Sequence, residues 1–119
     1  MHKIVVLGAS PNPERVSYKA VKSLIRRNYP VVPIGIRPGI IQSLPIVTGK
    51  PVIDEIHTLL LYIGPARQKE YYDYIISLKP KRIIFNPGTE NSELINLCKE
   101  NKIEVILDCA LIMLATGSF

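Results

Sequence analysis

The sequence predicts an α/β fold, a single doubly wound, mostly parallel sheet with helices on both faces. Three observations support this prediction. Short, continuous apolar runs recur along the chain, as in strands that are covered on both faces. Segments with helical periodicity separate these runs, and turns rich in Gly, Pro and Asn join them. Because the 119 residues show no internal repeat and no linker, we expect one domain over residues 1–119.

The first strand and helix suggest a phosphate-binding loop. Residues 4–7 are apolar, and Gly8-Ala9-Ser10 then turns the chain. Apolar residues follow at helical spacing, namely Val16, Ala20, Val21, Leu24 and Ile25. Such a unit directs free N–H groups and the positive end of a helix dipole to the tip of the strand, where they suit a phosphate. Gly8 is the sole glycine of this loop, so the G-x-G-x-x-G fingerprint is absent, and an ordinary turn is an equally good interpretation.

A second strand is predicted around residues 31–36, although Pro33 within it cannot donate a backbone hydrogen bond. Arg37 stands at its carboxyl end. In dinucleotide-binding folds this position faces the adenosine ribose, where an acidic residue binds the hydroxyls and a basic residue accommodates a phosphate. Arg37 therefore favours a ligand with a phosphorylated ribose, such as NADP or coenzyme A, over NAD. The alternative is a solvated arginine in a turn.

The middle of the chain predicts a long loop over residues 38–56, with one brief strand near residues 46–48 and no full helix. A buried strand over residues 58–63 follows, and Pro65 is well placed to begin a helix. The core face of this helix is predicted to contain Tyr71, Ile75 and Leu78, with Tyr72 and Ile76 beside them. We interpret Tyr71, Tyr72 and Tyr74 as packing or subunit-contact residues rather than as a base-stacking platform.

The last third of the chain continues the alternation. Strands over residues 82–85 and 104–107 flank a helix over residues 92–101, whose inner face contains Leu94, Ile95 and Cys98. Because the carboxyl ends of parallel strands lie at one edge of a sheet, the loops that follow them should converge on one crevice. These loops carry Gly8-Ala9-Ser10, Arg37, Ile63-Gly64-Pro65, Asn86-Pro87-Gly88 and Asp108-Cys109.

Composition narrows the function. The net charge of +5 favours polyanionic partners, and the scattered basic residues favour a phosphate-rich small molecule over nucleic acid. Cys98 and Cys109 are expected to be reduced, and His2 and His57 are too few and too far apart to predict a metal site. With no apolar run long enough for a membrane span and no secretory signal pattern, we expect a cytoplasmic protein without a membrane partner.

The chain resembles the small stand-alone coenzyme A-binding domain family, whose Rossmann-like fold also forms the nucleotide-binding domain of the succinyl-CoA synthetase α subunit. The family pattern begins G-A-S-x-N-P-x-R-x-S-Y and is matched by residues 8–18. A G-Y-x-V-x-P-V-N-P-like segment is matched by residues 28–38, and a later strand with a short Gly turn by residues 85–93. The segment around Gly35-Ile36 departs from the pattern, which has Val-Asn there, and Leu60 to Gly64 replaces a more polar strand end.

The resemblance implies coenzyme A as the cofactor. By matching position, Ser10, Arg15, Ser17 and Tyr18 would lie around its diphosphate, and Arg37 around its phosphorylated ribose. Together with the crevice positions, the predicted cofactor-binding residues are Gly8, Ala9, Ser10, Arg15, Ser17, Tyr18, Arg37, Gly64, Asn86 and Gly88. Two alternatives need no ligand: Ser17 as a helix N-cap, and Arg15 as a solvated side chain.

Two classes of function remain from the sequence. The first is a binding module, a carrier, sensor or regulatory protein for coenzyme A or acyl-CoA without chemistry of its own, acting alone, as a homodimer or with an enzyme partner. The second is an enzyme, either an NADP-dependent oxidoreductase or an acyl-CoA ligase component that depends on a partner. Asp108 and Cys109 are the residues placed for chemistry, but no histidine or lysine is predicted beside Cys109 to activate its thiol, so we favour the binding module and assign no catalytic residue.

Overall fold

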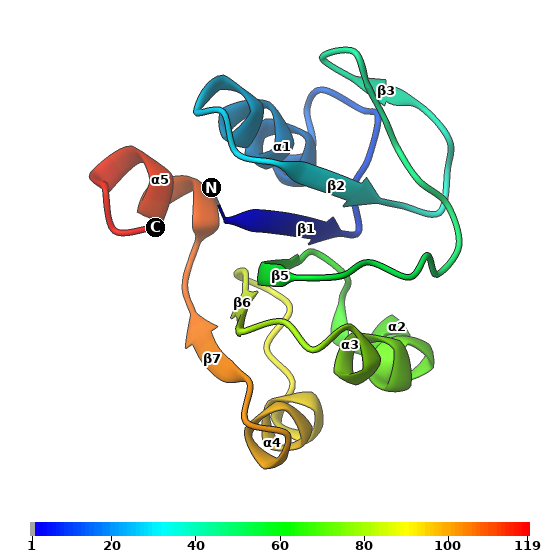
Figure 1. Ribbon diagram of the computed structural model, residues 1–119, viewed down its shortest axis with the longest axis vertical. Helices are drawn as coiled ribbons and strands as arrows, with labels where there is room; N and C mark the ends of the chain where they lie inside the picture. Colours follow the sequence, from blue (N-terminus) through cyan, green and yellow to red (C-terminus); the bar gives the residue numbers. More distant parts are fainter. Residues whose placement is uncertain (1) are drawn as a thin grey trace.

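A five-stranded parallel sheet forms the centre of the computed structural model, which describes residues 2–119 (Figure 1). In sheet order its strands are β2 (Val31–Ile34), β1 (Lys3–Leu7), β5 (Ile56–Leu61), β6 (Arg82–Phe85) and β7 (Glu104–Leu107). The predicted fold class, a doubly wound Rossmann-like sheet, is confirmed. The predicted bounds of β6 and β7 are also confirmed, whereas β5 begins and ends two residues earlier than residues 58–63.

Helices cover both faces of the sheet. On one face lie α1 (Val16–Arg26) and α5 (Ala110–Thr116), which pack against Ile4, Leu60 and Ile84. On the other face lie α3 (Tyr72–Leu78) and α4 (Ser92–Glu100). No helix among residues 2–119 combines the length and the apolar character that a membrane span requires.

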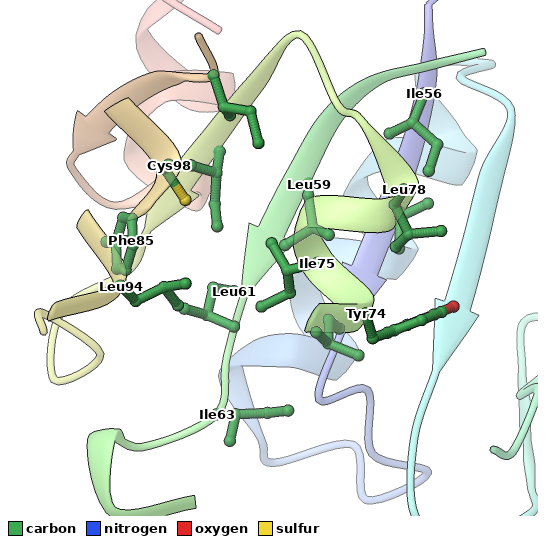
Figure 2. Packing of buried hydrophobic residues seen from close by; sticks show 14 of the residues in the cluster. Ile56, Leu59, Leu61, Ile63, Tyr74, Ile75, Leu78, Phe85, Leu94 and Cys98 are labelled. Atoms are coloured by element: carbon green, nitrogen blue, oxygen red, sulfur yellow. The ribbon is translucent and has the colours of Figure 1, made fainter. Parts of the chain in front are cut away.

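The core under α3 and α4 is mainly aliphatic, with Phe85 and Tyr74 as aromatic members, and its strand residues come from alternate positions (Figure 2). Ile75 and Leu78 of α3 pack beside Leu59 and Leu61 of β5. Cys98 on α4 is fully buried in this cluster, which confirms the core position predicted for it. Burial raises the pKa of its thiol to about 11, so this cysteine stays protonated and unreactive at neutral pH.

Pro33 is accommodated because β2 is an edge strand. Its carbonyl oxygen accepts a hydrogen bond from the Val47 N–H (2.9 Å), on the side away from β1. In a strand the N–H of a residue points to the same side as its carbonyl, so the donor that proline lacks would face the open edge and not β1. The loop carrying Val47 covers this edge.

Residues 38–55 contain no helix, as predicted for residues 38–56, but the short strands within them lie elsewhere than expected. A small hairpin pairs β3 (Ile40–Ile41) with β4 (Leu44–Pro45). The strand expected near residues 46–48 is reduced to a single parallel bridge between Val47 and Ile34.

The helix predicted from Pro65 is interrupted. It consists of α2 (Pro65–Gln68), a 3₁₀ turn η1 (Lys69–Tyr71) and α3. Pro65 does begin the first segment. Ile75 and Leu78 are buried as predicted, but the buried tyrosine is Tyr74, whose hydroxyl donates to the Pro51 carbonyl (2.6 Å). Tyr71, which was predicted on the core face, and Tyr72 are half-buried against the same core.

Candidate functional site

The carboxyl edge of the sheet contains a topological switch point between β1 and β5. The chain leaves β1 for α1 on one face of the sheet and leaves β5 for α2 and α3 on the other. In open parallel sheets, ligands bind where successive connections diverge in this way. The loops after β1, β2 and β5 therefore define the candidate site.

Gly8 makes the sharp turn at the end of β1. Its φ of +99° is a conformation that residues with a side chain rarely adopt. A β-carbon there would lie 2.9 Å from the carbonyl carbon of Tyr62, so the turn passes directly against the end of β5. Gly8 thus brings the two sides of the switch point into contact.

The N–H groups of Gly8 and Ala9 are not the free donors that we predicted at this bend. Both donate to the carbonyl oxygen of Ile34 at the end of β2, at 2.9 Å each. These two residues shape the loop and attach it to β2. The expectation that their amide hydrogens face a phosphate is therefore corrected.

Free donors are found at the start of α1 instead. Arg15 occupies the N-cap position without a side-chain capping bond, and the N–H groups of Val16, Ser17 and Tyr18 have no acceptor among residues 2–119. The Ser10 N–H is likewise free. Such orphan N–H groups, at the positive end of the helix dipole, suit an anion.

Ser17 is not the N-cap, so this interpretation of its role is wrong. It lies within the first turn of α1 and is 4% exposed. The loop before it is held by local bonds: the Asn12 N–H donates to Ser10 Oγ (3.1 Å), and the Arg15 N–H donates to the Asn12 carbonyl (3.0 Å). Ser10 accepts through its oxygen, so its hydroxyl proton remains available to a ligand.

The loop that carries Arg37 packs against the loop after β1. A β-carbon on Gly35 would collide with the Ala9 carbonyl oxygen, and one on Gly39 would lie 2.5 Å from Pro11 Cβ. Arg37, which is exposed, lies between these two contacts along the chain. The first of them explains why glycine stands at position 35, where the resembling family has a larger residue.

Gly64 and Gly88 leave open backbone surface at the ends of β5 and β6. A β-carbon at either position would have no atom within 4 Å. Both glycines lie at the carboxyl edge, beside the switch point. Because these residues have no side chains, the backbone at this part of the edge is accessible to a ligand.

Asn86, a predicted cofactor-binding residue, makes structural hydrogen bonds with its side chain. It is 2% exposed, and both ends of its amide are bonded. Nδ2 donates to the Leu61 carbonyl (3.0 Å), and Oδ1 accepts from the Ala110 N–H (2.9 Å). The side chain joins the end of β5 to the start of α5, and each of its two polar atoms already has a backbone partner.

Sequence reasoning missed a buried polar network beside this edge. Gln68 is fully buried, and its Nε2 donates to the carbonyls of Ile63 (2.7 Å) and Thr89 (2.8 Å). Its Oε1 accepts from Asn91 Nδ2 (2.9 Å). Asn91, the N-cap of α4, accepts from the Glu93 N–H, and asparagine directly before a helix was a signal for that role. No sequence signal marks Gln68.

Tyr62 and Cys109 lie near one another on the α5 side of the edge. The Tyr62 hydroxyl is buried and has no hydrogen-bond partner among residues 2–119, and burial, with a smaller effect of Cys109, raises its pKa. Cys109 is half-buried at the N-cap of α5, and Asp108 Oδ1 accepts from the Cys109 N–H (2.7 Å). His57 is the second residue of β5, at the end of that strand opposite to Tyr62, so it is not placed to activate the Cys109 thiol.

Two surface hollows lie away from these loops. One, of about 380 Å³, is lined by residues at the ends of α3 and α4, including Lys79, Lys81 and Lys102. The other, of about 470 Å³, lies between the end of α1 and the β3–β4 turn, with Asn28 and Ser43 in its wall. Neither is lined by a predicted cofactor-binding residue.

Comparison with solved structures supports the fold. A crystal structure of an uncharacterized protein is 44% identical, with a TM-score of 0.97, and the match covers 100% of this chain and 98% of that one. A protein from Thermus thermophilus is 21% identical (TM-score 0.86; 99% and 90% covered). A hypothetical protein from Pyrococcus horikoshii OT3 is 23% identical (TM-score 0.83; 96% and 81% covered).

No curated protein matches the sequence. A family model does, and its match extends over nearly the whole chain. It is described as a CoA binding domain and matches residues 2–115, which include every loop of the carboxyl edge. The chain therefore belongs to the CoA-binding domain family.

Proposed function

We propose that this protein binds coenzyme A at the switch point between β1 and β5 and acts as a binding module without chemistry of its own. The observation that carries the proposal is the group of free N–H donors at Ser10, Val16, Ser17 and Tyr18. They occur in a member of the CoA-binding domain family, at the positive end of a helix of 11 residues. A diphosphate there would accept several charge-assisted hydrogen bonds.

Three side chains complete the proposed diphosphate site. Arg15 is exposed at the N-cap of α1 and would supply a guanidinium to the phosphate oxygens. The Ser10 hydroxyl would donate its free proton. Tyr18, which is half-buried beside the start of the helix, would flank the ligand.

Arg37 would bind the phosphate on the ribose. The contacts of Gly35 with Ala9 and of Gly39 with Pro11 attach its loop to the diphosphate loop, so both phosphate groups would be held by neighbouring segments. A guanidinium suits this task because it presents several donors to the phosphate oxygens. This arrangement supports a ligand with phosphates at both places over NAD.

The pantetheine arm would leave the diphosphate along the edge, over the open backbone at Gly64 and Gly88. Asn86 would act beneath this path through its bonds to Leu61 and Ala110, not by touching the ligand. The Cys109 thiol lies at the same edge, and His57, at the opposite end of β5, is not placed to activate it, which supports binding over catalysis.

Calorimetric titration with coenzyme A, 3′-dephospho-coenzyme A, NADP and NAD tests this function. We expect coenzyme A to bind most tightly, and loss of its 3′-phosphate to weaken binding about tenfold, as for a lost charge-assisted hydrogen-bonded pair. Arg37→Ala should abolish that difference. Arg26→Ala is a matched control, because it removes the same charge from an exposed position at the far end of α1. Tighter binding of NADP would contradict the proposal and favour an oxidoreductase.

A further inference from the structure

The outer face of α1 carries an unbroken row of cations. Lys19, Lys22 and Arg26 are spaced three and four residues apart, so they point in nearly the same direction over about 10 Å of helix. The opposite face, with Ala20, Val21 and Leu24, is fully buried against the sheet. We call Lys19, Lys22 and Arg26 the α1 row.

No carboxylate balances this row from within the helix, since residues 16–26 contain neither aspartate nor glutamate. Two lysine ammonium groups among residues 2–119 donate hydrogen bonds to backbone carbonyl oxygens, those of Lys3 and Lys50. Neither of these lysines belongs to the row. Like charges three and four residues apart destabilise a helix. Arg26 in the last turn interacts favourably with the helix dipole, but the stability of α1 does not account for Lys19 and Lys22.

The neighbouring helix leaves the row unbalanced and adds an exposed apolar side chain. Residues 110–116 of α5 include no charged side chain. The two helices lie on the same face of the sheet (Figure 1), joined where Arg27 Nη2 donates to the Leu114 carbonyl (3.2 Å). Ile112 is 59% exposed on α5, with Leu111 half-buried beside it. This helix pair thus carries the cationic row on α1 and one exposed apolar side chain, Ile112, on α5. We call the two together the α1–α5 surface.

We propose that the α1–α5 surface binds an acidic amphipathic helix of another protein. Glutamates spaced three and four residues apart on one side of that helix would match the α1 row, and an apolar stripe beside them would cover Ile112. Charge complementarity selects an acidic partner. The exposed Ile112 favours protein over nucleic acid, because a sugar–phosphate backbone would leave this side chain against a polar surface. No residue of the α1 row belongs to the proposed coenzyme A site. Peptide binding can therefore be tested separately from coenzyme A binding.

The probe is a synthetic helical peptide with glutamates matching the row and an adjacent leucine stripe. Its binding to the full chain is measured by fluorescence anisotropy at about 0.15 M salt, where exposed charges are substantially screened. Two peptide variants replace the glutamates by glutamine or the leucines by serine. On the protein, Lys19→Glu with Lys22→Glu is compared with Lys69→Glu and Lys99→Glu, which change the net charge equally at exposed positions on other helices.

We expect the Lys19/Lys22 variant to lose about tenfold in affinity, the loss of roughly one strong charge pair, and the Lys69/Lys99 variant to stay within about twofold. Ile112→Ser should lower affinity severalfold, and the serine peptide should bind equally to both forms. Equal losses in the two charge variants would overturn the proposal, as would tighter binding of duplex RNA or of anionic lipid vesicles under the same conditions. Unfolding curves of every variant are recorded first, and Lys19→Gln replaces the Lys19/Lys22 variant if that variant does not fold.

Discussion

The carbonyl oxygen of Ala9 occupies the space where a β-carbon of residue 35 would stand, so Gly35 and Ala9 lie in direct backbone contact. This contact joins the loop after β1 to the loop after β2, and both are parts of the proposed coenzyme A site. A glycine is required at this point by space and not by a positive φ.

Gly35→Ala should therefore lower the free energy of unfolding by about 1–3 kcal/mol, the usual cost of overpacking. The backbone oxygen of Ala9 cannot move without weakening the bonds that Gly8 and Ala9 form with Ile34. Urea denaturation measures the change. Gly64→Ala is the control, since its β-carbon meets nothing within 4 Å, and it should stay within about 0.5 kcal/mol of the native protein. Equal stability of the two variants would contradict the contact.

Asn86→Ala should destabilise the protein by about 2–4 kcal/mol, because it leaves the Ala110 N–H and the Leu61 carbonyl without their partner in a buried site. The same denaturation experiment applies. Asn96→Ala, at an exposed position of α4, should have an effect below about 0.5 kcal/mol. If Asn86 instead contacts the ligand and contributes little to the fold, coenzyme A affinity will fall while stability is unchanged.

Two tyrosines allow a matched comparison. Within the described part of the chain the Tyr62 hydroxyl is buried without a partner, whereas the Tyr74 hydroxyl donates to Pro51. Tyr62→Phe removes an unpaired polar atom and should leave stability unchanged or raised. Tyr74→Phe removes a hydrogen bond and should cost about 0.5–1.5 kcal/mol. A larger loss for Tyr62→Phe than for Tyr74→Phe would mean that the Tyr62 hydroxyl has a partner in solution.

Stability should fall in mildly acidic solution because of His57. Its ring stacks on His2 at 3.6 Å between centroids, and Arg82 Nε donates to the Thr58 Oγ1 that lies 2.7 Å from His57 Nδ1. The Thr58 hydroxyl is thereby free to donate its proton to neutral His57. Burial, followed by the charges of His2, Arg82 and Lys81 against the opposing effect of Glu104, lowers the pKa of His57 below its usual 6.5.

The unfolded chain then binds the proton more readily than the folded one, so stability rises with pH. The contribution is complete above about pH 6.5, the unfolded pKa, and is lost as the pH falls through the lower folded value. Unfolding free energies at a series of pH values between about 4.5 and 8 measure it. His57→Gln should flatten this part of the profile, and an unchanged acid dependence in that variant would assign it to other groups.

Much of the fold follows from local pattern. Apolar runs bounded by turns located β6 and β7, and helical spacing placed Leu94 and Cys98 in the core. Pro33 fits within β2 because this strand lies at the edge of the sheet. The edge position depends on the order of the strands in the sheet, which the local sequence pattern does not give.

The hydrogen-bond partners at the site could not be predicted in the same way. The Ile34 carbonyl takes the N–H groups of Gly8 and Ala9 across more than 20 residues, as the sequence numbering shows. The side chains of Gln68 and Asn86 each form hydrogen bonds with two backbone groups, at least one of which is distant in the sequence. Such partners depend on how the loops meet in space, and no periodicity or spacing encodes them.

The most direct test of the account is an amide NMR titration with coenzyme A. We expect the N–H signals of Ser10, Val16, Ser17 and Tyr18 to shift strongly toward hydrogen-bonded values on saturation, because the diphosphate would take these free donors. The signals of Gly8 and Ala9, already bonded to Ile34, should move little. Coenzyme A binding that shifts Gly8 and Ala9 but leaves the four donors at the start of α1 unchanged would contradict the central claim.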